Sequence, residues 1–329
     1  MQIGIAYDLR SSMAVPAGAP SDRLEEYDSE ETIDAIAAAI EAAGHQPRRL
    51  GGGRSFVEAV LRQPPDLVFN IAEGSGTRSR EAQVPAVCEM LGIRYTHSDP
   101  LTLAVSLDKA MTKRLVDAAG VPTPRHQVIR TLDQLSRLEL PFPVMCKPLF
   151  EGSSMGIRRD SRASDAGELR GQVAKLLGDY RQPVLVEEFC PGAELTVGIL
   201  VRQGVPTAIG VMEIAPRQGD PGSFVYSLEV KRNYLEEVEY RVPPRLPPEL
   251  VQRAERVALD AFDALDCRDV ARVDLRLGAD GEPKFIEVNP LPGVSPVTSD
   301  LVILAGKVGL GYRQLIAGIV DSARARYGI

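Results

Sequence analysis

The segment Val270–Asn289 restricts the possible folds more than any other part of the sequence, because it predicts a β-hairpin. Asp280-Gly281 is a strong signal for a two-residue turn between strands that alternate apolar and polar residues. Side chains two apart in a strand share a face, so this turn gathers four polar side chains on one face, with Val273, Leu275, Ile286 and Val288 as core on the other. The four are Arg272 opposite Asn289 and Asp274 opposite Glu287.

Two directly opposed acids repel each other, so Asp274 and Glu287 need a compensating cation. Mg²⁺ prefers oxygen ligands and commonly uses one or two carboxylates together with phosphates. The other interpretation is a solvated hairpin face on which one acid is bonded to Arg272. The continuation Asn289–Gly293 leaves the strand abruptly, which suits the mouth of a site better than a plain sheet edge. A metal site is therefore favoured, with Asp274, Glu287 and Asn289 as its ligands.

Composition and charge exclude several classes of protein. The 329 residues are 44% hydrophobic and 25% charged, as in ordinary globular proteins, and are enough for two or three compact units. A net charge of −7 without a basic run argues against a nucleic-acid partner. Four scattered cysteines indicate reduced thiols rather than a zinc site or disulfides. The N-terminus does not resemble a signal peptide, and the apolar segment Leu301–Val320 is interrupted by Lys307 and Arg313, so no membrane span is expected.

The first hundred residues alternate strand and helix signals, which predicts a doubly wound parallel sheet with helices on both faces. Expected strands cover Ile3–Tyr7, Asp66–Ile71 and Ile93–Tyr95, and Asp28 and Glu31 have the spacing of a capping box that opens a helix ending at Gly44. One helix is expected over Leu103–Ala119.

Beyond Pro141 the pattern changes to strands and loops, which predicts an α+β catalytic part. The expected elements are strands at Val144–Lys147, Val184–Phe189 and Glu194–Val201, a lid-like loop with an edge strand in Asp220–Pro244, and a helix over Pro248–Leu265.

A phosphate-binding region is predicted around Lys147, which lies at the end of an apolar strand and needs an anionic partner. Four residues later the loop Glu151–Gly156 has two glycines and two hydroxyls, whose backbone amides can surround phosphate oxygens. Glu187, Glu188 and Phe189 end another strand, either as a solvated strand end or as the place where adenine and ribose bind. Lys109 is by default a surface lysine.

Four motifs in this order resemble the D-alanine–D-alanine ligase family of the ATP-grasp superfamily. They are SLDKAMTKRLVDAAGVPTP, FPVMCKPLFEGSSMGI, VLVEEFCPGAELTVGIL and ARVDLRL followed by FIEVNPLPGVS. The resemblance covers about Tyr95 to the C-terminus. It implies an N-terminal α/β domain at 1–100, a central ATP-grasp subdomain at 101–186, and a C-terminal domain with the metal site and lid at 187–329.

The resemblance also implies residue roles. Nucleotide and phosphate contacts fall on Lys109, Lys147, Glu151, Ser153, Ser154, Glu187, Glu188, Phe189, Glu194 and the lid residue Lys231. Asp274, Glu287 and Asn289 match the family's Mg²⁺ ligands, and Arg272, Ser153 and Lys231 its catalytic set. The implied cofactors are ATP and Mg²⁺, with two ions expected and Mn²⁺ possible as a substitute. The implied reaction is attack of a carboxylate on ATP to form an acyl phosphate, followed by attack of an amine.

The sequence departs from the family where amino acids bind. The early glycine-rich signature with its ammonium-binding acid is missing, and Asp28 or Glu31 is the candidate substitute, although both have sufficient roles as helix caps. Glu73 stands where a histidine is usual, and Arg232 stands where the lid has a tyrosine. Arg232 recognises a substrate carboxylate or is a solvent-facing lid residue. The loop after Gly293 is longer than usual and includes Ser299 and an added acid, Asp300.

These departures favour a cytoplasmic ligase that joins amino acids, or an amino acid and another amine, different from the family's standard pair. A D-alanine–D-alanine ligase of peptidoglycan synthesis is the alternative, and a catalytically silent ATP-binding protein is a third. The expected partners are small-molecule substrates and a second copy of the chain in a homodimer, with neither nucleic acid nor membrane.

Overall fold

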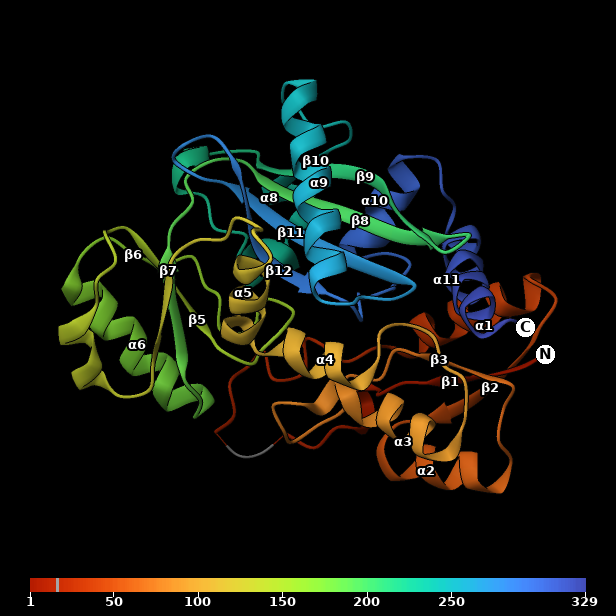
Figure 1. Ribbon diagram of the computed structural model, residues 1–329. Coiled ribbons are helices and arrows are strands. Elements are labelled where there is room, and N and C mark those ends of the chain that lie inside the picture. Colours follow the sequence, from red (N-terminus) through yellow and green to blue (C-terminus); the bar gives the residue numbers. More distant parts are fainter. Residues whose placement is uncertain (16–17) are drawn as a thin grey trace.

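The computed structural model describes residues 1–15 and 18–329, which contain three β-sheets (Figure 1). The N-terminal sheet is parallel, in the order β2-β1-β3. Its strands are β1 (Gln2–Ala6), β2 (Gln46–Gly51) and β3 (Leu67–Asn70). The predicted strand at Ile93–Tyr95 is reduced to a single bridge between Val68 and Tyr95.

Helices cover both faces of the N-terminal sheet, which confirms the doubly wound prediction. Alternation decides the faces: Ile3, Ile5 and Phe69 are fully buried on one side, against α1 and α11, while Val68 lies in a second core on the other side, against α2 and α3. The four helices are α1 (Glu30–Ala42), α2 (Gly53–Arg62), α3 (Gln83–Leu91) and α11 (Tyr312–Tyr327). The last helix of the chain therefore completes the core of the first sheet.

A four-stranded antiparallel sheet follows, in the order β4-β7-β5-β6. Its elements are β4 (His126–Ile129), η3 (Leu132–Arg137), β5 (Val144–Pro148), β6 (Arg162–Ala163), α6 (Ala166–Tyr180) and β7 (Val184–Glu188). One face packs on α6 through Leu169, Val173 and Leu176. The other face carries the charged side chains of Lys147 and Glu187.

The third sheet is antiparallel with the order β10-β9-β8-β11-β12. Its elements are β8 (Glu194–Arg202), β9 (Val205–Pro216), β10 (Val238–Arg241), α9 (Pro248–Ala264), β11 (Val270–Leu277), β12 (Pro283–Asn289) and α10 (Asp300–Lys307). The helix α9 covers one face and α10 covers the other. Gly198 permits the close approach of α10, because a Cβ there would lie 2.8 Å from Leu301 Cδ1.

The helix predicted over Leu103–Ala119 is two helices, α4 (Pro100–Leu107) and α5 (Lys109–Ala118). Asp108 breaks it: its backbone is extended, and its carboxylate accepts a 3.1 Å hydrogen bond from the backbone N–H of Met111. Competition of this kind between an aspartate side chain and helical backbone bonds is what places such residues at caps. The break makes Lys109 the first residue of α5 and turns its side chain toward the loop at Glu151.

The segment predicted as a loop with an edge strand contains two short helices, α7 (Leu228–Arg232) and α8 (Tyr234–Glu237), after the 3₁₀ turn η4 (Pro221–Ser223). The edge strand is confirmed as β10. Within the described residues, no single helix has the length and apolar character to cross a membrane. The pair α10 and α11, which meet at 109°, passes that test together by length and composition only.

Candidate active site

The β11–β12 hairpin places its four polar side chains as predicted, with Arg272 opposite Asn289 and Asp274 opposite Glu287. The turn itself is different, because five residues rather than two connect the strands and a bulge follows Asp274. The bulge restores the register at the site. It also moves Phe285 into the core in place of Ile286, whose side chain instead lines a cavity beside Glu287.

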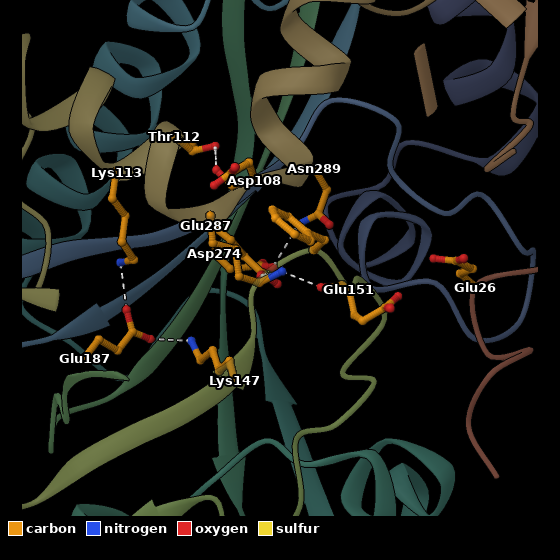
Figure 2. A network of polar contacts seen from close by, with 12 residues as sticks. Glu26, Asp108, Thr112, Lys113, Lys147, Glu151, Glu187, Asp274, Glu287 and Asn289 are labelled. Atoms are coloured by element: carbon orange, nitrogen blue, oxygen red, sulfur yellow. Dashed lines mark hydrogen bonds and ion pairs between the residues drawn. The ribbon is translucent and has the colours of Figure 1, made fainter. Parts of the chain in front are cut away.

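Each acid of the hairpin has a cationic partner. Arg272 donates to Asp274 through Nε at 3.0 Å and Nη2 at 2.8 Å, and Lys109 Nζ lies 3.7 Å from Glu287 Oε2. Asp274 also accepts from Thr196 at 2.9 Å and from Asn289 at 3.2 Å. Figure 2 shows Asp274, Glu287 and Asn289 gathered at one point. The pairing of one acid with Arg272 is the contact that the solvated-face interpretation predicted.

The donor set of the hairpin fits a hard divalent cation by its chemistry, since it offers two carboxylates and an amide oxygen on one face. Within residues 1–15 and 18–329 no group of three or more His, Cys, Asp or Glu side chains has the arrangement of a metal site. Two protein acids are enough only if the ion takes its remaining ligands from phosphate oxygens and water, as Mg²⁺ does at nucleotides.

Lys147 finds the anionic partner that its burial requires. Glu187 lies between two lysines, with 2.5 Å from its Oε1 to Lys147 Nζ and 2.8 Å from its Oε2 to Lys113 Nζ (Figure 2). Burial raises the pKa of Glu187, but the two lysines outweigh burial and lower it to about 2. The group carries one positive charge in excess, which an anion such as a phosphate can neutralise. Sequence reasoning missed Lys113, whose only signal is its position one helical turn after Lys109.

A small cavity of about 70 Å³ brings most of the predicted nucleotide residues together. Its lining includes Lys147, Ser154, Glu187, Glu188, Phe189, Glu194, Lys231, Asp274 and Glu287. Arg276 closes one end: its guanidinium carbon lies 4.7 Å from the centre of the Phe189 ring, and its Nη1 lies 3.5 Å from Glu194. Burial raises the pKa of Glu194. Glu188 points to Arg125 at the rim.

The loop Glu151–Gly156 lies between this cavity and a larger one. Ser153 lines the larger cavity and Ser154 the smaller. Both serines have left-handed backbone, with φ of 49° and 58°, a conformation that costs free energy in non-glycine residues and often occurs at ligand sites. Glu151 does not face the phosphate region, because its carboxylate is bonded to Gln182 at 2.7 Å and Arg80 at 3.4 Å, while its backbone oxygen accepts from Lys109.

The larger cavity has a volume of about 670 Å³ and unites predicted residues from the whole chain. These include Asp28, Glu73, Lys109, Ser153, Lys231, Arg232, Arg272, Glu287, Asn289, Gly293 and Ser299. A pocket of this size holds an amino acid or a dipeptide with room to spare. The N-terminal part, the loop Glu151–Gly156, the helix α7 and the β11–β12 hairpin therefore meet around one space.

Asp28 is not the cap of α1. Ser29 is the N-cap, since its Oγ accepts from the backbone N–H of Thr32 at 3.4 Å. Asp28 instead faces the larger cavity, and burial together with the nearby Asp8 raises its pKa to about 7. Glu31, the other predicted cap residue, accepts from the Ser29 hydroxyl and has an exposed side chain at the cavity edge. Asp28 therefore does not cap α1, so the cap role that competed with substrate binding for this residue is excluded.

The lid residues occupy different positions. Lys231 Nζ lies 5.0 Å from the centre of the Tyr226 ring, on the wall shared by both cavities. Arg232 reaches across to the N-terminal part and bonds to Glu25 at 2.6 Å. Sequence reasoning missed the group next to them, in which the hydroxyls of Tyr226 and Tyr240 donate to Asp300 at 3.1 and 3.2 Å.

Gly293 and Ser299 stabilise the loop between them. The Oγ of Ser299 accepts from the backbone N–H of Ser295 at 2.9 Å, and a Cβ at position 293 would lie 3.0 Å from that Oγ. Glycine at 293 therefore allows the loop to fold closely over the cavity.

The three-sheet fold and this site agree with the comparisons. Residues 115–321 match the family model described as the D-ala D-ala ligase C-terminus. The uncharacterized protein y4sG of Sinorhizobium fredii is 34% identical, over 89% of this chain and 88% of that protein. A D-alanine–D-alanine ligase of Moorella thermoacetica is 31% identical, over 94% of this chain and 98% of that protein.

Among solved structures, the Bacillus anthracis D-alanine–D-alanine ligase complexed with ATP has a TM-score of 0.73, covering 100% of this chain and 99% of that one. At 22% sequence identity this likeness shows the fold, which is ATP-grasp. Fold and comparisons together define an ATP-dependent ligase that forms a carbon–nitrogen bond, uses a divalent metal and acts on small amino-acid substrates. The chain belongs to the D-alanine–D-alanine ligase family.

Proposed function

We propose that this ligase joins the carboxyl group of one amino acid to the amine of a second substrate, and that its substrate pair is not two D-alanines. One observation carries the proposal. The larger cavity combines the family's phosphate and acyl residues Lys109, Ser153 and Arg272 with an amino-acid wall that is acidic, at Asp28 and Glu73. The family's ammonium-binding signature and histidine are absent from that wall.

The reaction follows from these residues. A carboxylate oxygen of the first substrate attacks the γ-phosphorus of ATP, ADP leaves, and an acyl phosphate forms. The amine of the second substrate attacks the acyl carbon, phosphate leaves with the bonding electrons, and the amine loses one proton. Arg272 donates hydrogen bonds to the oxyanion that develops at the acyl carbon. Lys147 and Lys231 neutralise phosphate charge, and Ser153 orients the transferred phosphoryl group through the loop backbone.

Asp274, Glu287 and Asn289 would hold the divalent ion, for which we propose Mg²⁺, with two ions and with Mn²⁺ as a possible replacement. A bound ion would supply positive charge that offsets the negative charge of the phosphates. Arg272 and Lys109, which hold the two acids in this structure, keep the site compact until nucleotide arrives. The smaller cavity, at about 70 Å³, requires the lid and the Phe189 side chain to move before adenine enters beside Glu187.

The division of the chain into 1–100, 101–186 and 187–329 is proposed as a functional one, supported by the three separate sheets. Since β7 runs to Glu188, the second boundary is better drawn after that residue. Action in the cytoplasm, as a homodimer, is likewise a proposal; four buried free thiols suit a reducing compartment.

A D-alanine–D-alanine ligase proper is the second candidate, favoured by the 31% identity with the Moorella thermoacetica enzyme over 94% of the chain. Phosphate release from ATP in the presence of Mg²⁺ tests both, with single and paired D- and L-amino acids. Release that depends on D-alanine alone supports the second candidate. Release that requires another amino acid, or a separate amine, supports the proposed function, and silence with every pair contradicts both.

A further inference from the structure

The N-terminal wall of the larger cavity carries more acid than one amino-acid ammonium group needs. Asp28, Glu73 and Glu81 line the cavity, and no hydrogen bond or ion pair engages their carboxylates in the part of the chain that the structure describes. Other acids of this wall are paired: Glu25 with Arg232 and Glu26 with Arg80. The three free carboxylates come from different places, before α1, after β3 and in the 3₁₀ turn η2 (Arg80–Ala82).

At each of these three acids, burial outweighs the nearby cations, which are Arg10 for Asp28, Arg80 for Glu73, and Arg80 with Lys109 for Glu81. Burial, followed by Glu81 and Glu26, raises the pKa of Glu73 well above its ordinary value. Burial raises the pKa of Glu81 to about 7, although Arg80 opposes it. A carboxylate whose charge is compensated by neighbouring cations has a lowered pKa instead, as Glu187 does between its two lysines.

A fourth polar group points to a ligand in the same space. Ser106 lines the cavity from α4, which packs against η2, and its side chain is nine-tenths buried. Its hydroxyl has no hydrogen-bond partner among the described residues. Buried polar groups are normally satisfied, so an unpaired hydroxyl in the lining of this cavity indicates a polar ligand. The unpaired acids of the same lining favour a cationic one.

The cavity lining also has a basic wall. Lys109, Lys231 and Arg272 lie on α5, α7 and β11, around the position where the acyl group reacts. Figure 2 shows Glu26, on the acidic side, separated from Asp274 and Asn289 by Glu151. A ligand that matches both walls has its carboxylate at one end and more than one positive charge at the other.

We propose that the carboxyl-donating substrate is a diamino acid, an amino acid with a second ammonium group on its side chain, held by Asp28, Glu73 and Glu81. This rests on the proposed function for the identity of the cavity as the amino-acid site. The α-ammonium and side-chain ammonium groups bind the three acids and the Ser106 hydroxyl, while the carboxylate faces Arg272. A neutral side chain of the same length leaves buried carboxylates without a partner, a loss that sites of this kind use to reject substrates.

Matched substrates test the proposal: lysine against norleucine and ornithine against norvaline, in both stereochemical forms, alone and with alanine as the amine. The assay is phosphate release with ATP and Mg²⁺. The expected result is a kcat/KM for the diamino acid at least about 100-fold above that of its neutral counterpart. If the neutral amino acid is used equally well or better, the protein is still a ligase but the diamino-acid proposal is wrong.

Variants of the cavity acids test whether these side chains cause the preference for a diamino acid. Glu73→Gln and Glu81→Gln should each raise KM for the diamino acid about tenfold or more, and by more than they raise KM for the neutral counterpart. Glu41→Gln, an exposed change of the same charge at the far end of α1, should change neither value. An unaltered preference in both cavity variants would overturn the proposal.

Calorimetry separates this proposal from the function on which it rests. Lysine should bind the wild-type protein at least about tenfold more tightly than norleucine does, and the Glu73→Gln/Glu81→Gln double variant should lose that difference. Lysine binding of this kind without phosphate release from any substrate pair would contradict the proposed ligase reaction and support the cation site. Equal binding of lysine and norleucine would overturn the cation site whether or not phosphate is released.

Discussion

Glu187 and Glu73 are both enclosed glutamates near the ends of strands, in β7 and after β3, yet their surroundings are opposite. Glu187 lies between Lys113 and Lys147, which lower its pKa to about 2 in spite of burial. Around Glu73 the main neighbours are Glu81 and Glu26, and its pKa is raised well above the ordinary value. On the nucleotide side, the folded protein itself pairs Glu187 with two lysines. On the amino-acid side, Glu73 has no such partner, and the proposed partner is the substrate.

The difference predicts how the same substitution acts in the two regions. On the nucleotide side, loss of a charge leaves a buried partner unpaired, so stability and activity fall together. On the acidic wall, loss of a charge relieves repulsion, so stability rises while recognition of the substrate weakens. This inverse relation between stability and function is typical of binding sites.

Glu187→Gln has the largest expected effect on stability. The change leaves Lys113 and Lys147 buried at 1% and 7% exposure with no carboxylate between them, which should cost about 3–5 kcal/mol in the free energy of unfolding. Urea denaturation followed by circular dichroism measures it. The neighbouring Glu188→Gln, which loses only an exposed partner at Arg125, is the matched control and should change little. A similar small loss for both variants would show that the lysines do not depend on Glu187.

Asp274→Asn should lower kcat by about 10²–10³-fold, because it removes a ligand of the divalent ion and the strongest partner of Arg272. Thr196→Val is its control, since this change removes only one 2.9 Å hydrogen bond to Asp274 and should lower kcat less than about tenfold. The measurement is phosphate release over a Mg²⁺ titration. If excess Mg²⁺ restores neither variant and both lose activity equally, the role of Asp274 is to position Arg272 rather than to bind metal.

Glu73→Gln should change stability in the direction opposite to Glu187→Gln. It removes a half-buried carboxylate whose neighbours are mainly acids, so the free energy of unfolding should rise by about 1 kcal/mol. The same urea denaturation compares the two glutamine variants directly. A destabilisation of about 2 kcal/mol or more would mean that Glu73 has a cationic partner in solution, as Glu187 does.

Acidic residues with raised pKa values also predict the pH dependence of stability. Asp28 and Glu81 each have a pKa of about 7 in the folded protein, whereas the ordinary values are 3.8 for aspartate and 4.5 for glutamate. Between those values and pH 7, the two groups are protonated in the folded state and ionised in the unfolded chain. The folded state binds more protons in that interval, so stability is greatest below about pH 4 for these groups and falls as pH rises through 7. Each group contributes about 1.4 kcal/mol per pH unit between its unfolded and folded pKa, so from pH 5 to 8 the wild-type protein should lose up to about 5 kcal/mol more than the Asp28→Asn/Glu81→Gln double variant. Parallel curves for the two proteins would contradict the assigned shifts.

The sequence predicted the parts of the site that depend on regular structure. The alternation in β11 and β12 was enough to place Arg272 opposite Asn289 and Asp274 opposite Glu287. The prediction was less accurate in detail, because five residues rather than two connect the strands, and a bulge after Asp274 places Phe285 in the core. A β-bulge has no reliable sequence signature, although its effects on register are large.

Contacts between residues far apart in the chain could not be predicted from the sequence. Nothing in the local pattern connects Lys113 to Glu187, which are 74 positions apart. They meet only because α5 packs beside β4, whose neighbour in the sheet is β7. Asp28 was predicted as a cap by its spacing from Glu31, but Ser29 next to it has the better geometry and leaves Asp28 free to face the cavity. The Tyr226–Tyr240–Asp300 group combines the lid segment, the edge strand and α10, so it appears only once the fold is known.

Arg232→Ala should have the smallest effect and tests the contact that joins the two regions. Its side chain is nearly half exposed and bonds to Glu25 at 2.6 Å, a pair worth about 0.2–1 kcal/mol after screening by solvent. If Arg232 acts only through Glu25, then Arg232→Ala, Glu25→Gln and the double variant should show the same modest increase in KM, with unchanged kcat and substrate preference.

The alternative role for Arg232, recognition of a carboxylate on the second substrate, gives a different pattern. Arg232→Ala would then raise KM for that substrate far more than Glu25→Gln does, and Glu25→Gln would even lower it, because the guanidinium would be released to bind the substrate. The double-mutant cycle decides between them, since a coupling energy equal to the whole single-variant effect means that the arginine has no partner other than Glu25. We expect that result, because Arg232 on α7 already pairs with Glu25 of the N-terminal part, and both residues line the larger cavity.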